Sequence, residues 1–283
     1  MSQVVSGPGG NARPDLPLAV VVGAGGMAMA VARRLGPGHR LLIADRDGEH
    51  LARQVARLDE EGHDAAGLRC DLTSAEDIAA LAERAAAAGP VKVLANVVGL
   101  SVAAGDFDLI MRVNLIGAAR VAEAFLPVFA PGGCGVFVSS SSAHMSPVAP
   151  ELWPLLDAPT APDFLDRLHA ALGDKAEVNL AYPLSKAALN RMCLRLAAPW
   201  GRKGLRILSM SPGLIATPMG AEAYKHSAGK RKLFDAVPVG REATMLEVAD
   251  LVAFLVSDRA SYLSGTDILM DGGLIAALRF PEA

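Results

Sequence analysis

The chain has 283 residues, of which 52% are hydrophobic and 20% are charged, and its formal net charge is −3 at pH 7. This length and apolar content predict one large α/β domain or two smaller ones with a sizeable core. The charge gives no basic surface for nucleic acid. The longest apolar run, from Leu18 to Ala32, is too short and too rich in glycine to span a membrane.

Three widely spaced cysteines, Cys70, Cys134 and Cys193, predict free thiols in a reducing compartment. The stretch from Met1 to Asp15 is rich in Gly, Pro and Ser and lacks the charged-then-apolar layout of a signal peptide. We therefore expect a cytoplasmic protein with a flexible N-terminal segment over residues 1–16.

The first predicted strand, Leu18 to Val22, is continuously apolar, as is typical of a buried parallel strand. It runs directly into a glycine turn that contains Gly23, Gly25, Gly26 and Met27, and a helical pattern follows. A strand, a glycine turn and a helix in this order favour binding of a dinucleotide pyrophosphate at the helix N-terminus. The alternative is a tight turn that binds no ligand.

The second predicted strand, Arg40 to Ala44, ends at Asp45, about 20 residues after the glycine turn. A carboxylate at this place accepts hydrogen bonds from both hydroxyls of an adenine ribose and repels a 2′-phosphate, which predicts NAD(H) as the preferred cofactor. Arg46 follows directly and is able to pair with a phosphate, so NADP(H) stays open as the alternative.

The rest of the chain continues to alternate between strands and helices. Further predicted strands cover Ala66 to Cys70, Val91 to Ala95, Gly135 to Val138, Leu205 to Met210 and Asp267 to Met270. Predicted helices cover Ala75 to Ala88, Met111 to Phe129, Asp163 to Leu172 and Thr244 to Val256. This alternation predicts a Rossmann-type doubly wound parallel sheet of about seven strands flanked by helices. We expect residues 17–283 to form this single domain.

Tyr182 and Lys186 are four residues apart at the start of a predicted helix, so they lie on one face. Pro183 is expected near the helix start, where its missing N–H costs nothing. A nearby ammonium is expected to lower the pKa of the tyrosine from about 10 toward 7, where proton transfer is efficient. The alternative is an ordinary pair of side chains on a helix surface.

With these pieces together, the chain resembles the classical short-chain dehydrogenases/reductases over roughly Pro17 to Gly273. The matching motifs, in the family's order, are Gly23 to Ala28, Asp71-Leu72, Asn96-Val97-Val98-Gly99, Asn114, the serine run Ser139 to Ser142, Tyr182 with Lys186, Pro212-Gly213 with Thr217, and Asp271-Gly272-Gly273. Two departures lie in positions that support the cofactor. The family pattern has Asn-Asn-Ala-Gly where this chain has Asn96 to Gly99, and a glycine where this chain has Ala28.

The resemblance implies a hydride transfer between a nicotinamide ring and a carbonyl or secondary alcohol carbon, with four catalytic residues. Tyr182 would exchange the proton, Lys186 would support it and hold the nicotinamide ribose, and Asn114 would hold a water in a proton relay. A serine would fix the substrate oxygen; counting along the strand places Ser140 there, with Ser141 as the second choice.

The resemblance also implies the groups that bind the cofactor, and no metal. The cofactor-binding residues would be Gly23, Gly25, Gly26, Met27, Asp45, Arg46, Asp71, Leu72, Asn96, Val97, Gly99, Tyr182, Lys186, Pro212, Gly213, Ile215 and Thr217. Among these, Asp71 and Leu72 would flank the adenine, and the loop from Pro212 to Thr217 would bind the nicotinamide carboxamide.

The stretch from 145 to 177, which precedes Tyr182, is longer than in ordinary family members and resembles the 3α-hydroxysteroid dehydrogenase/carbonyl reductase branch. It is rich in Leu and Pro and contains no predicted strand. We expect this insertion to act as a lid over an apolar substrate site or as a subunit contact, because long connections in compact domains are usually functional. The family commonly uses the outer face of the Tyr182 helix for dimer contacts, so a homodimer or homotetramer is expected.

The sequence therefore predicts an NAD(H)-dependent oxidoreductase for a hydrophobic ketone or secondary alcohol, such as a steroid or a cyclic ketone. The alternative is a dinucleotide-binding regulatory protein on the same fold with little turnover. No partner other than a small-molecule substrate and further copies of the chain is expected, and neither nucleic acid nor membrane.

Overall fold

The computed structural model describes residues 4–6, 12–145, 147–217 and 228–281. Within these residues the chain forms one 8-stranded sheet with the order β1-β4-β3-β2-β5-β6-β7-β8. The strands are β1 (Val4–Ser6), β2 (Leu18–Val22), β3 (Arg40–Asp45), β4 (Ala65–Arg69), β5 (Val91–Asn96), β6 (Phe129–Val138), β7 (Arg206–Pro212) and β8 (Asp267–Met270). The strands from β2 to β8 run parallel to one another, which confirms the predicted doubly wound parallel sheet.

The sheet gains one strand that the sequence did not predict. Val4–Ser6 pairs antiparallel with β4, with Val4 opposite Leu68 and Ser6 opposite Ala66. The expectation of a flexible segment over residues 1–16 is therefore wrong for these three residues, where two consecutive valines favour a strand. Residues 1–3 and 7–11 of that segment lie outside the described part of the chain.

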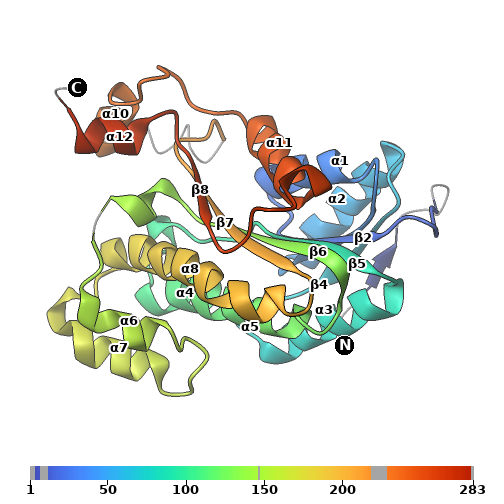
Figure 1. Ribbon diagram of the computed structural model, residues 1–283, viewed down its shortest axis with the longest axis horizontal. Helices are drawn as coiled ribbons and strands as arrows, with labels where there is room; N and C mark the ends of the chain where they lie inside the picture. The colour runs from blue at the N-terminus through green and yellow to red at the C-terminus, as the bar shows by residue number, and fades with distance from the viewer. Residues whose placement is uncertain (1–3, 7–11, 146, 218–227, 282–283) are drawn as a thin grey trace.

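Helices cover both faces of the sheet (Figure 1). They are α1 (Gly26–Leu35), α2 (Gly48–Glu60), α3 (Ala75–Ala88), α4 (Phe107–Met111), α5 (Ala118–Phe125), α6 (Trp153–Leu156), α7 (Phe164–Leu172), α8 (Val178–Gly201), α10 (Ala228–Asp235), α11 (Met245–Val256) and α12 (Leu274–Arg279). One apolar core lies between the sheet and α1, α2 and α11, and a second between the sheet and α3, α5 and α8. The strands are buried on both sides, which explains their continuously apolar sequences.

The helix predicted over Met111 to Phe129 differs from the observed one at both ends. The helix begins at Phe107, because the Asp106 side chain accepts a hydrogen bond from the Leu109 N–H and caps the first turn. It ends at Phe125, two residues before a proline that cannot continue a helix, and Phe129 already belongs to β6. Between α4 and α5 the helix widens into a π-helical turn, η2 (Arg112–Gly117).

The insertion over residues 145–177, of which residue 146 is not described, folds into short helices outside the two main layers. They are η4 (Pro150–Leu152), α6, α7 and η5 (Gly173–Lys175). Figure 1 shows α6 and α7 beside α4 and α8, away from the sheet. Their buried side chains form a third apolar cluster with those two helices and η2. Fully burying one such leucine or phenylalanine contributes about 2 kcal/mol, so the cluster fixes the insertion firmly.

Polar contacts reinforce this attachment to α8. The carboxylate of Asp157 accepts two hydrogen bonds from the Arg191 guanidinium, at 2.8 and 3.0 Å, and lies 3.2 Å from Arg195 Nη1. The same Arg191 guanidinium lies 4.9 Å from the centre of the Trp153 ring. The insertion is therefore held to the outer face of α8 by a bidentate ion pair and a cation–π contact as well as by apolar packing.

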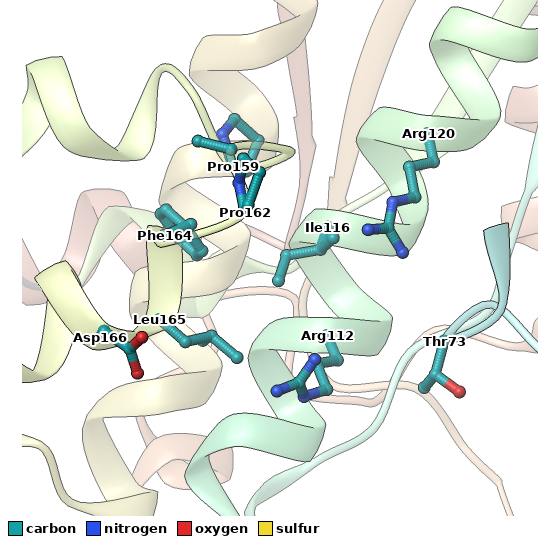
Figure 2. Close-up of a pocket in the computed structure, with 10 residues that line it drawn as sticks. Thr73, Arg112, Ile116, Arg120, Pro159, Pro162, Phe164, Leu165 and Asp166 are labelled. Carbon is teal, nitrogen blue, oxygen red and sulfur yellow. The ribbon is translucent and has the colours of Figure 1, made fainter.

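A hollow of about 150 Å³ remains where the insertion meets the helix formed by η2 and α5. Figure 2 shows Arg112, Ile116 and Arg120 along one wall and Phe164 and Leu165 of α7 on the other. Its lining contains none of the four predicted catalytic residues. We expect the substrate site at the carboxyl ends of the strands instead.

No helix in the described ranges is long and apolar enough to cross a membrane.

Candidate active site

Tyr182 and Lys186 lie one turn apart on α8, with the tyrosine in its second turn. Pro183 is near the start of α8, as expected, but it is the sixth residue of a helix that begins at Val178, so its missing N–H does remove an intrahelical hydrogen bond. The helix therefore lacks one backbone N–H donor beside Tyr182. The Ser185 hydroxyl donates to the Tyr182 carbonyl at 2.8 Å, a local bond between a side chain and the preceding turn of the same helix.

The serine run follows directly from β6 and ends in a short 3₁₀ turn, η3 (Ser141–His144). Ser140 forms a side-chain hydrogen bond with Tyr182. Ser139 instead donates its hydroxyl to the carbonyl of Lys186 at 3.1 Å, and Ser141 is buried. Of the two serines that the sequence left open, the structure brings Ser140 to the tyrosine hydroxyl.

Lys186 is buried, with only 3% of its surface exposed. Its ammonium donates to the carbonyl of Val138 at 2.9 Å and lies 5.9 Å from the centre of the Tyr182 ring. Burial lowers the pKa of this amine to about 8, because the charged form loses its hydration. A lysine with this pKa exists in both protonation states near neutral pH.

The expected lowering of the tyrosine pKa is not what the structure gives. Burial of its hydroxyl raises the pKa of Tyr182, and the hydrogen bond from Ser140 opposes this only in part. Loss of hydration dominates this shift, because the charged phenolate would be buried away from water. Tyr182 is therefore a protonated hydroxyl in the protein alone.

The buried amine leads to a prediction about stability. At low pH the amine is protonated in the folded and in the unfolded chain, so folding carries the whole cost of burying a cation. Between pH 8 and 10.5 the folded amine loses its proton before the unfolded one does, and this cost disappears. We expect Lys186→Met to raise the melting temperature relative to the natural chain most at pH 7, with the difference shrinking toward pH 10. A difference that is independent of pH would contradict the buried cation.

Asn114 lies in the π-helical turn η2 and is 2% exposed. Its side chain accepts from the Leu100 N–H at 2.8 Å and donates to the Leu100 carbonyl at 2.9 Å and to Ser185 Oγ at 3.2 Å. It thereby joins the segment after β5 to α8. A Cβ placed on Gly99 would lie 3.0 Å from Lys186 Nζ and 3.6 Å from Asn114 Oδ1, so all three groups meet at one point.

The glycine turn lies at the crevice where the strand order reverses, between β2 and β5. Gly23 has a φ of 115°, which side chains disfavour, and Gly25 has open space around it. Gly26 lies against α11, where an added Cβ would come within 2.8 Å of Met245 Sδ. Helix α1 begins here without a side-chain cap, so the first N–H groups, including that of Met27, are available to an anion.

Asp45 ends β3 next to this turn. Its carboxylate accepts from the Ala24 N–H at 2.8 Å and from the Asp47 N–H at 3.0 Å, which fixes it beside the glycine turn. Arg46 is exposed and approaches Asp71, the next acidic residue along the same edge. The Thr73 N–H and hydroxyl lower the pKa of the Asp71 carboxyl, and Arg46 lowers it further.

The remaining predicted cofactor residues lie along the same edge of the sheet. Asn96 ends β5 and is 2% exposed, and its Oδ1 has no partner among the described residues. Val97 continues the strand by donating to the Val22 carbonyl at 2.9 Å. Leu72 is buried beside Gly117, where a Cβ would collide with it. This edge therefore combines open backbone, one orphaned acceptor and two carboxylates.

The loop after β7 completes the edge. Pro212 is the last residue of β7, and Gly213 lies so close to Asp271 that a Cβ would come within 2.7 Å of its Cα. Ile215 pairs with Ala243 in an isolated parallel bridge, and Thr217 is the last described residue before the gap at 218–227. The predicted residues Pro212, Gly213 and Ile215 therefore lie at or just after the carboxyl end of β7.

Ser185 is the residue of this site that sequence reasoning missed. Its hydroxyl contacts both the Tyr182 carbonyl and the Asn114 amide, so it ties two of the predicted catalytic residues together. A small polar residue directly before Lys186 was the only signal in the sequence, and it does not specify these partners.

Two family models match the chain on either side of the insertion. The model described as short chain dehydrogenase matches residues 17–150, and the one described as Enoyl-(Acyl carrier protein) reductase matches residues 170–275. The matches leave residues 151–169 between them, which contain the last two residues of η4, all of α6 and the first part of α7. The site residues all lie within the two matched regions.

Relatives cover nearly the whole chain. It is 31% identical to short-chain dehydrogenase/reductase bsc3 of Alternaria brassicicola, over 92% of this chain and 96% of the relative. It is 32% identical to 3-alpha-hydroxysteroid dehydrogenase/carbonyl reductase of Comamonas testosteroni, over 78% of this chain and 91% of the relative. Among solved structures, a variant of actinorhodin polyketide ketoreductase with NADPH is 28% identical and superposes with a TM-score of 0.73, over 93% of this chain and 98% of that one. The chain therefore belongs to the short-chain dehydrogenases/reductases, oxidoreductases that act on CH–OH and ketone groups with NAD(P).

Proposed function

We propose that the protein is an NAD(H)-dependent oxidoreductase that interconverts a hydrophobic ketone and its secondary alcohol, with Tyr182 as the acid and base. The observation that carries this proposal is the convergence of Tyr182, Ser140, Lys186 and Asn114 at the carboxyl ends of β5 and β6. A regulatory protein that only binds dinucleotide would need none of these side chains in contact.

The edge of the sheet fits a dinucleotide. The uncapped start of α1 and the open Gly25 would receive the pyrophosphate, Asp45 the adenine ribose, and Asp71 with Leu72 the adenine. The other predicted residues, Gly23, Gly26, Met27, Arg46, Asn96, Val97, Gly99, Pro212, Gly213, Ile215 and Thr217, would complete the cradle. When bound, the nicotinamide exchanges a hydride with the substrate carbon.

The side chains of the site would manage the proton and the substrate oxygen. The protonated Tyr182 hydroxyl donates its proton to the oxygen of a ketone as that oxygen becomes an alkoxide. The Ser140 hydroxyl bonds the same oxygen and stabilises its developing charge. Lys186 would restore a proton to the tyrosine, and Asn114 would hold a water in this relay. With its pKa raised, Tyr182 is in the protonated form that the reduction of a ketone requires.

The insertion would give the substrate site its apolar character. Leu100, Leu180 and the ring of Tyr182 pack against the third apolar cluster, which the insertion builds with α4 and α8. The apolar wall therefore reaches from the insertion to the catalytic tyrosine. A steroid or a cyclic ketone has the rigid apolar body that such a wall would bind.

The insertion also bears on assembly. It covers the outer face of α8 near Trp153 and Arg191, where family members commonly form a dimer. We therefore propose a homo-oligomer that does not use this part of α8. We also propose a cytoplasmic location. The three cysteines are all buried and free, which fits a reducing compartment.

Replacing residues 147–176 with a short Gly/Ser linker should raise KM for bulky ketones at least about tenfold, because the apolar wall is lost. The Kd for NADH should change less than about threefold, since no residue proposed to hold it lies in the insertion. Steady-state kinetics, NADH fluorescence titration and light scattering give the three readouts. An Asp157→Ala variant, which loosens the insertion without removing it, should show a smaller effect of the same sign. Unchanged selectivity and unchanged oligomer size in the folded variant would exclude both roles.

The function itself is tested by a panel of steroids, cyclic ketones and aliphatic alcohols, with turnover read from NADH absorbance. We expect the rigid apolar ketones to give the largest kcat/KM. Binding of NADH without turnover of any member would favour the regulatory alternative.

A further inference from the structure

A largely buried polar cluster joins the segment that carries Ser140 to the last two strands of the sheet. His144, the last residue of η3, places its Nε2 2.8 Å from Asp267 Oδ2 on β8 and 3.4 Å from Ser211 Oγ on β7. Asn190 of α8 donates to the same Ser211 hydroxyl at 3.1 Å. The side chains of His144 and Asp267 are 26% and 10% exposed, so water competes little for their bond.

His144 lies at the end of the segment that carries Ser140, directly before the insertion. The segment from Ser139 to His144 is fixed at its start, where the Ser139 N–H donates to the Met210 carbonyl and its hydroxyl to the Lys186 carbonyl. Beyond His144 the chain enters the insertion, beginning with the exposed Met145. Ser140 therefore lies between a fixed start and a long connection that is fixed elsewhere, on α8.

The turn between these two ends has little stability of its own. It is a four-residue 3₁₀ helix, and such helices have poor hydrogen-bond geometry. Within it, Ser140 Oγ accepts from the Ser142 N–H at 3.2 Å, so the serine that bonds Tyr182 is also the cap of the turn. Movement of the turn would move the serine hydroxyl with it.

His144 supplies the second fixed point. Its ring bonds Asp267 and Ser211, and its carbonyl accepts from Arg279 Nη2 of α12 at 3.3 Å. The turn is thereby attached to β7, β8 and the C-terminal helix at the residue where the insertion begins. Through Ser211 and Asn190 the attachment continues to α8, one turn beyond Lys186.

We infer that His144 is a positioning residue for the reaction, and that its bond to Asp267 holds Ser140 opposite Tyr182 and isolates it from movements of the insertion. The inference rests on the proposed roles of Ser140 and Tyr182. His144 lies behind the reacting groups and touches neither the substrate nor the cofactor.

The test is a double-mutant cycle between His144 and Ser140. Ser140→Ala should lower kcat about a hundredfold, and His144→Leu about tenfold, with the Kd for NADH unchanged. If His144 acts through the serine, the double variant should be no slower than Ser140→Ala alone. His144→Gln, whose amide nitrogen reaches the place of Nε2, should restore most of the activity.

The matched control is another His–Asp pair among the described residues. His169 Nε2 lies 2.6 Å from Asp108 Oδ1 and joins the insertion to α4 on the surface. His169→Leu should leave kcat within about twofold of the natural chain, because it does not touch the serine turn. Effects of His144→Leu and Ser140→Ala that multiply, or an unchanged kcat in His144→Leu, would overturn the inference.

Hydrogen exchange tests the same idea without turnover. In His144→Leu the amides of residues 139–145 should exchange at least about tenfold faster, whereas His169→Leu should leave them unchanged. Asp267→Asn weakens the same bond from the other side and serves where the leucine variant does not fold. Protection that stays intact in a folded variant would overturn the inference. Loss of protection in a protein that turns over no substrate would support the anchor and reject the proposed function.

Discussion

Replacing Tyr182 by phenylalanine should lower kcat about a thousandfold, because the variant keeps the ring and loses only the transferable proton. The Kd for NADH should change less than about twofold, since the ring still fills its place on α8. Single-turnover kinetics and a fluorescence titration with NADH separate these two quantities. A variant that retained more than a tenth of the natural kcat would show that the proton comes from another group.

Tyr262 provides the matched control for this experiment. It is fully exposed and lies far along the chain from the serine turn, after α11. Tyr262→Phe removes a tyrosine hydroxyl from the surface and should leave kcat unchanged.

A lysine variant tests the neighbour of Tyr182. Lys186→Ala should reduce both kcat and the affinity for NADH, because the amine is proposed to support the tyrosine and to hold the nicotinamide ribose.

The second large effect concerns the choice of cofactor. We expect kcat/KM with NADH to exceed that with NADPH at least about a hundredfold, because Asp45 would face the 2′-phosphate in a poorly hydrated site. Its carboxylate cannot turn away freely, since the Ala24 and Asp47 N–H groups both donate to it. Arg46, the residue that would favour NADPH, approaches Asp71.

Asp45→Asn removes the charge and keeps an acceptor for the Ala24 N–H. The ratio of the two kcat/KM values should therefore fall below about ten while the fold of the glycine turn is retained. Arg46→Ala distinguishes the effect of Arg46 from that of Asp45. It should raise the ratio of kcat/KM with NADH to kcat/KM with NADPH above that of the natural chain. Equal values for NADH and NADPH in the natural chain would show that Arg46 dominates the site.

The sheet was predictable because each strand carries its own signal. Leu18 to Val22 is apolar throughout, and a run buried on both faces needs no alternation. A helix was also predicted around Asn114, but its π-helical turn was not, because such a turn is fixed by what its side chains contact. Strand β1 also depends on a distant partner, since Val4–Ser6 becomes a strand only by pairing with β4.

The sequence predicted which residues form the site better than it predicted the pKa values of their side chains. The order of the motifs brought Tyr182, Lys186, Ser140 and Asn114 together, and the structure places them in one region at the strand ends. The sign of the tyrosine pKa shift was wrong, because spacing alone suggests an effect of Lys186 and gives no measure of burial. The bond between His144 and Asp267 joins residues far apart in the chain, and no local pattern predicts it.

Because the three apolar clusters are separate, the residues of one cluster can evolve without disturbing the other two. The first two build the layers around the sheet, whereas the third joins the insertion to α4, η2 and α8. Substitutions at Leu165 or Leu168 therefore leave the glycine turn and its helix untouched. Under the proposed role of the insertion, such substitutions change the substrate range while the cofactor site stays constant. A single scaffold of this kind can give rise to lineages that share one chemistry and differ in what they accept.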